Sequence, residues 1–519
     1  MTYGRPGVYV TETLATAPVQ SVGSTSAAAA VIGVFAEGPS VVPSAPVKSI
    51  SEFTSLFGEL SPLYPATIAV RQFFDNGGTE LYVKRVLGAN AGKASAALPA
   101  TPSGTLATAT ALNKGSFGTT YSVAITANGG GTYNLAVYRQ VTVGSSTTKK
   151  LVENYTNLVF NNRNASNFAG TVVNNSSAVL NLSSIDTTAT PKTTSSETAL
   201  TGSSLDGSAV VAADYIAALP ADGTSEFSGI DRPLVIFAAG VYEKFLVDAT
   251  TITEEVISDA IGDFADVCDQ LTAWAASGNG FAVLDTVPGL SVGDALTFAS
   301  NRDQISQAAV YYPNYFIQDT TSASPQATRK IGPAAAVVGN YLATDSSKGP
   351  FKAPAGINAK IKNAIALERS FSSVDLDQLN SGNSPVNAVR NLAGGNGIAI
   401  MGARTLLQDG TGNRYVNVRR SLIHIEKSIN DLVQFALFAN NDYKLWGQLT
   451  TVVNVFLNQY YNKGGLRGNS PKDAFYVKVD GTNNSPSDIQ NGVVNIEVGV
   501  ALEYPAEFIV LNIAQITGA

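Results

Sequence analysis

Patterns typical of short buried strands alternate with patterns typical of amphipathic helices along much of this chain, and this alternation limits the fold most strongly. Apolar runs of strand length occur at residues 27–35, 80–87, 232–240, 280–289 and 308–319. Helical spacing of apolar residues appears at 64–78 and 253–277, and a further helix is expected to start at 300–307. Because such elements pack in layers, we predict a layered α/β core built from residues 23–90 and 205–360.

Two helices in this core carry specific expectations. A short helix is predicted to begin at Ser51. The longer helix at 253–277 is expected to bury one face, made of Ile257, Ile261, Phe264, Val267, Cys268 and Leu271.

A stretch of different composition interrupts this alternation. Residues 91–204 are rich in Thr, Ser, Asn, Ala and Gly, with Glu153, Asp186 and Glu197 as their acidic residues. Two alternating segments about a Gly-rich turn at 121–143 predict a β-hairpin. We therefore predict an inserted β-rich domain at 91–204, with disorder of 160–204 as the alternative because such polar tracts bury little surface.

The last third of the chain is predicted to form a separate domain, residues 361–519. A strand is expected at 415–420, where the sequence alternates, and helices are expected after it and at 442–462. The first of these helices is expected to pack through an apolar face made of Leu422, Ile425, Ile429, Leu432, Val433, Ala436 and Leu437.

Both ends of the chain alternate as strands do. Residues 1–22 are predicted to form an extended arm, and residues 493–516 a final strand without a partner strand close behind it. Since a free strand pairs readily with the edge of another sheet, we predict that both ends link neighbouring molecules. The alternative is that the two termini pair within one molecule. The residues predicted to form these intermolecular strands are Val8, Tyr9, Val10, Glu503, Phe508 and Val510.

Composition argues against several classes of protein. Of the 519 residues, 14% are charged, against roughly 25% in ordinary soluble chains. Such a low value is expected when neighbouring molecules cover much of the surface; the alternative is a robust extracellular or particle-borne protein that gains little from solvated ion pairs. The net charge of −7 predicts no general attraction to nucleic acid or to an anionic membrane. No signal peptide and no apolar run of membrane-spanning length is evident. We therefore expect a soluble chain, made in a cytoplasm, without membrane insertion.

Residues suited to catalysis or metal binding are scarce. Cys268 is the sole cysteine and His424 the sole histidine, so metal sites with more than one thiolate are excluded and a triad hydrolase would depend on His424. A structural or interfacial histidine is the favoured interpretation. Asp263, Asp266 and Asp269 share a helix face, where a solvated surface is the ordinary alternative to a metal site.

Other catalytic motifs are equally weak. The sequence has neither a dinucleotide-binding glycine motif nor a phosphate-binding loop motif. Glu503 and Glu507 flank Pro505, and paired carboxylates occur in glycoside hydrolases, but these two lie in an apolar alternating segment. We expect no catalytic residue, no bound metal and no cofactor, and hence not an enzyme.

Taken in order, several motifs of the chain resemble those of contractile tail sheath proteins from myophages, R-type pyocins and related contractile injection systems. The similarity covers nearly the whole chain and is densest in its last quarter. Its motifs are PGVYVTE at 6–12, GSTSAAAAVIGVFAEGP at 23–39, FFDNGGTELYVKRV at 73–86, SQAAVYYPNYFIQD at 306–319, NGIAIMGARTL at 396–406, NNDYKLW at 440–446, FLNQYYNKGGLRG at 456–468 and EYPAEFIV at 503–510.

The resemblance implies a structural subunit that assembles with itself into stacked rings of six around an inner tube. Contraction of such a sheath drives the tube through a target cell envelope. The implied partners are the tail tube protein, the baseplate and the tail terminator. The implied location is the tail of a virion or an injection particle assembled in the cytoplasm of a bacterial host. A non-contractile shell or tube protein is the main alternative, and a hydrolase is a remote one.

The polar, Thr/Ser/Asn-rich composition of the insert suits solvent, so we predict that it lies on the outside of the sheath. The resemblance implies that the C-terminal region lines the lumen of the sheath and touches the tube. On the helix at 442–462 and just beyond it, the predicted tube-facing residues are Lys444, Gln448, Lys463 and Arg467. The sequence departs from the family before Asn440, where an acidic residue and a proline are common and this chain has Phe438 and Ala439. That loop is therefore expected to differ in detail.

Overall fold

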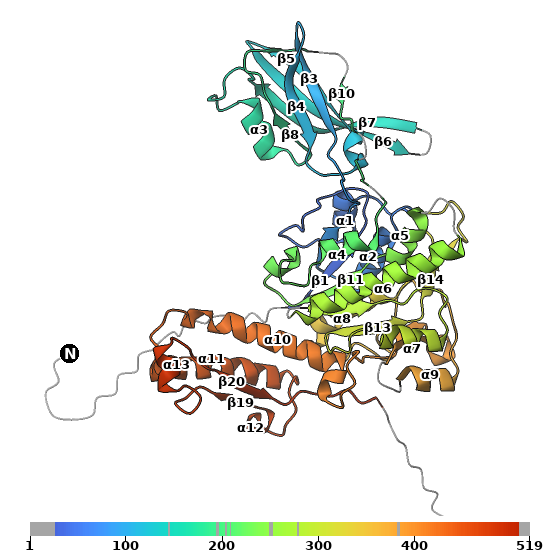
Figure 1. Cartoon of the computed structure of the whole chain (residues 1–519), viewed down its shortest axis with the longest axis vertical. Coiled ribbons are helices and arrows are strands. Elements are labelled where there is room, and N and C mark those ends of the chain that lie inside the picture. Colours follow the sequence, from blue (N-terminus) through green and yellow to red (C-terminus); the bar gives the residue numbers. More distant parts are fainter. Residues whose placement is uncertain are drawn as a thin grey trace, which may run out of the picture.

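The computed structural model describes residues 26–507, apart from 144–145, 194–196, 203–204, 208, 249–252, 278–279 and 381–384. The predicted N-terminal arm and its residues Val8, Tyr9 and Val10 lie outside the described residues, as do Phe508 and Val510. Figure 1 shows three bodies in a row: the β-rich insert, the α/β core and the C-terminal part.

The core is built on a seven-stranded sheet with the strand order β18-β17-β13-β12-β11-β1-β2. Adjacent strands run parallel, except that β18 is antiparallel to β17. The α/β class predicted from the sequence is thus confirmed. The strands are β1 (Ala28–Gly33), β2 (Leu81–Arg85), β11 (Leu234–Ala238), β12 (Gly280–Leu284), β13 (Ala308–Tyr312), β17 (Asn387–Asn391) and β18 (Ile398–Ile400).

Helices cover both faces of this sheet because its strands are apolar on both sides. In β1, Ala29 and Val31 face one hydrophobic cluster, while Ala30 and Ile32 face the other. The first cluster contains residues of α1 (Ile50–Phe57), α2 (Pro65–Asp75) and α8 (Ala334–Lys348). The second contains residues of α4 (Ala212–Ala218), α5 (Val241–Asp248), α6 (Glu254–Ala276), α7 (Val292–Ser300) and α9 (Ser373–Asn380).

Three local expectations for the core were wrong. No helix starts at 300–307. The helix of this region is α7, which starts earlier because Ser291 and Asp294 form a capping box, and which ends at Ser300. The short helix α1 begins at Ile50, one residue earlier than predicted, with Ser49 as its N-cap. On α6, Ile257 and Ile261 are exposed, whereas Ala260 and Phe264 are the first buried residues of the helix.

The core also extends further along the chain than predicted. Strands β17 and β18 follow residue 361, yet they belong to the seven-stranded sheet. A boundary at 361 therefore cuts through the core. Between β13 and β17 the chain forms a small separate sheet, β15-β14-β16, and only then adds β17 and β18 to the large sheet. The strands of the small sheet are β14 (Tyr315–Gln318), β15 (Thr328–Ile331) and β16 (Ala366–Leu367).

The insert forms two four-stranded antiparallel sheets, β8-β4-β3-β9 and β10-β5-β6-β7, around one apolar cluster. The predicted hairpin is β5–β6, closed by glycines with positive φ at 129–131. The described residues of 160–204 contribute a helix and three strands, which argues against disorder there. The elements are β3 (Ser95–Thr101), β4 (Thr105–Ala111), β5 (Tyr121–Gly129), β6 (Thr132–Val143), β7 (Ser146–Leu158), α3 (Ala169–Ser176), β8 (Leu180–Ser183), β9 (Thr190–Pro191) and β10 (Thr198–Ala199).

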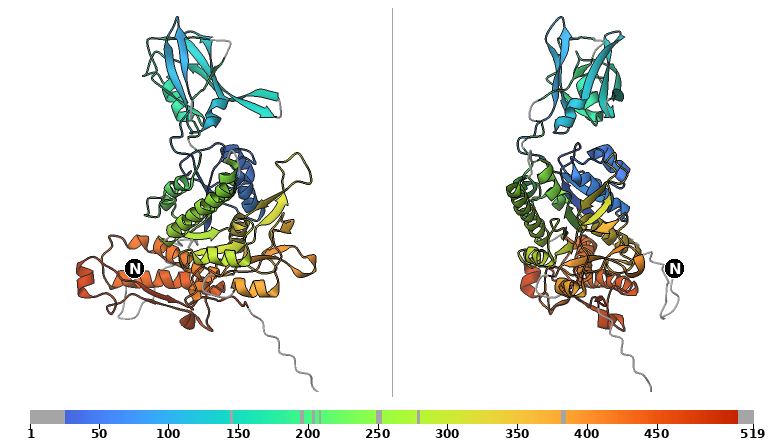
Figure 2. Two further views of the ribbon diagram at one scale, coloured as in Figure 1. Left: turned by 45° about the vertical axis from the view of Figure 1, so that its right-hand side comes forward. Right: turned by 90° about the vertical axis from the view of Figure 1, so that its right-hand side faces the viewer.

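The two connections between insert and core lie side by side. The N–H of Gly92 donates to the carbonyl of Leu205 at 2.9 Å. The buried guanidinium of Arg85 donates to the core carbonyls of Phe35 at 2.9 Å and Gly38 at 2.9 Å, and to that of Lys114 in the insert at 2.7 Å. In the views of Figure 2 the insert stays clear of the C-terminal part.

The C-terminal part packs two long helices against a β-ribbon. Residues 416–420, expected to be a strand, belong instead to the first helix, because the apolar residues Val416 and Val418 continue into the helical pattern of Ile425. The elements are α10 (Val416–Val433), α11 (Tyr443–Asn462), α12 (Pro471–Ala474), β19 (Phe475–Lys478), α13 (Pro486–Gln490) and β20 (Glu497–Val500).

Candidate assembly surfaces

Helix α11 carries the first of the predicted tube-facing residues. Its N-cap Asp442 accepts hydrogen bonds from the backbone N–H groups of Lys444 at 2.9 Å and Leu445 at 3.0 Å. One face is buried against α10 and the ribbon, through Leu445, Leu449, Val453, Phe456, Leu457 and Tyr460. Lys444 and Gln448 are exposed. The sequence pattern thus assigned the buried and exposed sides of this helix correctly.

The four predicted tube-facing residues do not form one patch. Lys444 and Gln448 lie on the first turns of α11, whereas Lys463 and Arg467 follow its last residue. At about 1.5 Å rise per residue, Lys444 and Lys463 are separated by about 28 Å along the axis. Lys463 lines a cavity beside the core, and the guanidinium of Arg467 lies 5.2 Å from the ring centre of Tyr504.

The connection between α10 and α11 presents apolar side chains to solvent, which the sequence pattern did not predict. Phe438 is fully exposed and has a positive φ of 62°. Leu437 was expected to pack on the buried face of the preceding helix but is exposed, because that helix ends in a 3-10 turn at Gln434–Ala436. We call this set the apolar tip; it consists of Phe435, Leu437, Phe438 and Tyr443.

Exposed apolar clusters of this kind mark contact surfaces. The tip lies at the end of α10–α11 that points away from the core in Figure 1. The departure from the family motif at Phe438 and Ala439 was the signal in the sequence that pointed to it.

Strands β19 and β20 form a two-stranded antiparallel ribbon in which Phe475 pairs with Val500 and Lys478 with Glu497. The final alternating segment was expected to lack a nearby partner, so this pairing within the chain corrects that expectation for its described part. Among the described residues the ribbon has no third strand. Within the described residues its two outer edges have no strand partner, and beside the end of β20 Leu502 forms an isolated bridge with Leu466.

The chain leaves the ribbon as an irregular segment. Glu503 was expected within a strand, but its carbonyl accepts a hydrogen bond from the Asn417 side chain at 3.0 Å instead of a strand partner. Glu507 is held by Arg404, whose Nη2 lies 2.5 Å and whose Nε lies 3.1 Å from its carboxylate oxygens. The Glu507 carboxylate is therefore engaged in an ion pair with Arg404.

A cavity of about 570 Å³ lies between the core and the C-terminal part. His424 is buried in its wall, with its ring 5.7 Å from that of Tyr460, which agrees with the structural or interfacial interpretation. Across the same junction Arg420 of α10 forms a buried ion pair with Asp345 of α8, with Nη1 3.1 Å from Oδ1. The Arg420 guanidinium also stacks on Tyr341 at 4.5 Å.

The described part of the chain contains no group of three or more His, Cys, Asp or Glu side chains placed to hold a metal ion. On α6, Asp266 is exposed and Asp269 is paired with Arg302 at 2.6 Å. None of the described helices is both long and apolar enough to cross a membrane.

Comparison with known proteins confirms the resemblance to tail sheath proteins. No family model matches the chain. The tail sheath protein of Vibrio phage KVP40 is 27% identical to it over 177 residues, which is 34% of this chain and 25% of that protein. The matched region thus spans about a quarter of the length of this curated relative.

Solved structures extend the similarity over the whole chain. The helical sheath of the anti-feeding prophage in its contracted state aligns with 99% of this chain and 100% of its own, at a TM-score of 0.57 and 19% identity. The PVC sheath complex of an extracellular contractile injection system, also in the contracted state, aligns with 99% of this chain and 98% of its own, at a TM-score of 0.52 and 19% identity. A sheath tail protein of Listeria innocua aligns with 92% of this chain and 95% of its own, at a TM-score of 0.58 and 12% identity. The chain therefore has the fold of contractile sheath proteins.

Proposed function

We propose that this chain is the structural subunit of a contractile sheath, which polymerises as stacked rings of six around an inner tube and contracts to drive the tube through a cell envelope. The observation that carries the proposal is the end-to-end fold match with a sheath in its contracted state, which leaves neither chain with a large unmatched part. The part-length similarity to a phage tail sheath protein supports it from the sequence.

Contraction requires a subunit that keeps its fold while its contacts change. A body with two packings of different energy supplies such a switch. The continuous α/β core fits a rigid body of this kind, since its sheet is buried by helices on both faces. The low charged content of 14% fits a surface largely covered by neighbours.

We propose that the chain ends form the links that persist during contraction. Residues 1–22, with Val8, Tyr9 and Val10, and the residues after Glu507, with Phe508 and Val510, would add strands to the ribbon of a neighbour. The two unpaired edges of β19 and β20 support this proposal. Each added backbone hydrogen bond contributes about 0.5–1.5 kcal/mol, and a strand supplies several of them.

For the tube contact we propose the end of α11 that carries Lys444 and Gln448, next to the apolar tip. Exposure of both polar side chains and of Phe438 supports this choice. Lys463 and Arg467 face another environment, near the core and Tyr504, and belong to the proposal only as a separate, second contact. The further proposed partners are the baseplate and the tail terminator, at the two ends of the polymer.

The insert is proposed to lie on the outside of the sheath. It meets the core through two adjacent connections and stands at the opposite end of the molecule from the C-terminal part, which supports an outer position when the latter lines the tube. We place such a sheath in a virion tail or in an injection particle that is assembled in a bacterial cytoplasm.

Electron microscopy of the purified full-length chain tests the proposal. The expected result is wide, hollow cylinders with a regular axial repeat, formed by the chain alone. Closed shells or narrow tubes would favour a passive structural protein, and uniformly small particles at high concentration would contradict self-assembly. Either outcome would overturn the sheath assignment.

A further inference from the structure

A small polar cavity lies in the core, away from every surface discussed above. It has a volume of about 30 Å³, enough for one ion or one or two waters. Residues that follow the carboxyl ends of three neighbouring strands line it: Gly240 after β11, Asp285 and Thr286 after β12, and Asn314 after β13. In open α/β sheets ligands bind in this position, near the point where the strand order reverses, which here is between β11 and β1.

The walls of this cavity carry oxygen atoms with few partners. Asp285 and Glu243 contribute carboxylates. Thr286 and Asn314 are almost completely buried, and neither Thr286 Oγ1 nor Asn314 Oδ1 has a hydrogen-bond partner among the described residues. A buried oxygen left without a partner costs free energy, so two in one cavity point to an occupant.

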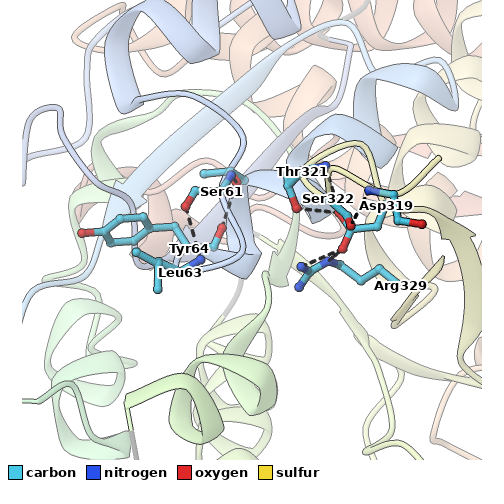
Figure 3. Close-up of polar contacts among 9 residues, drawn as sticks. Ser61, Leu63, Tyr64, Asp319, Thr321, Ser322 and Arg329 are labelled. Carbon is cyan, nitrogen blue, oxygen red and sulfur yellow. Dashed lines mark hydrogen bonds and ion pairs between the residues drawn. The ribbon is translucent and has the colours of Figure 1, made fainter. Parts of the chain in front are cut away.

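The neighbouring cations are engaged elsewhere. Arg329 lines the cavity, but its guanidinium is paired with Asp319, with Nη2 2.9 Å and Nε 3.1 Å from Oδ2, as Figure 3 shows. Lys330 is paired with Glu368 at 2.6 Å. Four carboxylates thus surround two cations, which leaves a formal charge of −2 for the cavity and its immediate partners.

The two carboxylate oxygens of Asp285 have different surroundings. Its Oδ1 accepts a hydrogen bond from the N–H of Ala334, the first residue of α8, at 2.6 Å. A Cβ at Gly332 would lie 2.2 Å from Oδ2, so only a glycine there leaves that oxygen free of a clash.

We propose that this cavity binds a single divalent cation of the hard type, Mg²⁺ or Ca²⁺, through Asp285, Glu243, Thr286 and Asn314. Carboxylate, amide and hydroxyl oxygens are the ligands that these ions prefer, and water completes their coordination. The ion connects the ends of β12 and β13 with α5. Without it, the carboxylates of Asp285 and Glu243 line the same cavity as the buried oxygens of Thr286 and Asn314, which have no hydrogen-bond partner among the described residues. The proposal is independent of the sheath assignment.

Equilibrium dialysis of the chelator-treated full-length protein against MgCl₂ or CaCl₂, with metal quantified by mass spectrometry, tests this site. The wild type is expected to bind a single ion per chain. The variant Asp285→Asn is expected to lose at least about tenfold in affinity. The matched control is Asp266→Asn, which removes an exposed carboxylate of α6 and should bind as the wild type does.

Thermal unfolding gives a second measurement on the same samples. The ion is expected to raise the midpoint of the wild type and of Asp266→Asn, but not that of Asp285→Asn, because only a ligand bound to the folded state stabilises it. Should Asp285→Asn fail to fold, Glu243→Gln carries the same expectation. Absence of binding by the wild type, or an affinity equal to that of the wild type in a folded cavity variant, would overturn the proposal in favour of water in the cavity.

Discussion

Arg404 and Glu507 form a bidentate ion pair between residues 103 positions apart in the sequence, with Nη2 2.5 Å from Oε2 and Nε 3.1 Å from Oε1. Arg404 follows the last strand of the core sheet and also donates to the carbonyl of Asn380 at 2.7 Å. The pair therefore fixes the point from which the proposed C-terminal arm leaves the molecule.

Loss of this anchor should weaken assembly more than folding. The variant Glu507→Gln removes the charge, and a bidentate Arg–carboxylate pair then becomes a single neutral contact. We expect a folded chain with unchanged circular dichroism and a several-fold lower yield of polymer in sedimentation. Glu503→Gln is the control, since the structure gives its carboxylate no ion pair among the described residues. Equal polymer yields for both variants would show that assembly does not depend on the ion pair that holds the start of the proposed C-terminal arm.

The buried pair of Arg420 and Asp345 joins the core to the C-terminal part, and breaking it should cost stability. Arg420→Met leaves the carboxylate of Asp345 buried without its partner, so we expect a loss of about 3–5 kcal/mol in the free energy of unfolding. The double variant Arg420→Met with Asp345→Leu should recover most of this loss in urea unfolding.

A surface pair provides the comparison. Arg71 and Asp75 lie one helical turn apart at 3.5 Å on α2, and both side chains are partly exposed, so Arg71→Met should cost less than about 1 kcal/mol. If Arg420→Met cost no more than Arg71→Met, the junction between core and C-terminal part would not depend on the buried pair.

These two pairs illustrate what the sequence could and could not predict. Apolar periodicity located most strands of the core, and it assigned the buried face of α11 correctly because packing alone dictates that pattern. It failed at 415–420, where six residues fit either a strand or the first turns of a helix. It also misplaced the boundary at 361, since the pairing of β17 with β13 is a contact distant in sequence.

The surfaces were harder to predict than the core. The exposure of Lys444 followed from the helical pattern, whereas Lys463 lies beyond the last residue of α11. The distance between them follows from the length of that helix, which the resemblance-based assignment of both residues to one surface did not take into account. The polar cavity was missed because its ligands are dispersed over 243–314. The available signal was an acidic residue, Asp285, directly after a buried strand.

Glu37 should make stability depend on pH. Burial raises the pKa of Glu37 to about 7, with the charges of Arg139 and Arg85 opposing it. The folded state therefore keeps a proton that the unfolded state releases above its ordinary pKa of 4.5. This contribution to stability is fully present below about pH 4.5 and is lost as the pH rises through about 7.

The variant Glu37→Gln should remove this dependence. Between pH 5 and pH 8, urea unfolding should show the variant gaining on the order of 3 kcal/mol relative to the wild type, because folding raises the pKa of Glu37 from 4.5 to about 7. Glu255→Gln, at an exposed position of α6, should run parallel to the wild type. Parallel curves for all three proteins would contradict the raised pKa.

The two ends of α11 should contribute differently to the tube contact. Reversing Lys444 with Lys444→Glu places a repulsive or unpaired charge beside the apolar tip, so we expect sheaths that assemble without tube. Lys463→Glu is the matched change at the other end, and it should leave tube-filled particles. Particle counts by electron microscopy distinguish them. The opposite result would move the tube contact to the side of Lys463 and Arg467.

The most direct measurement is a helical reconstruction of the polymer formed by the full-length chain, examined by cryo-electron microscopy. The account predicts a hollow cylinder with six subunits per ring, with strands of neighbouring chain ends added to the β19–β20 ribbon and the insert on the outer surface. A polymer in which this ribbon keeps only its own two strands, or in which the insert lines the lumen, would contradict it.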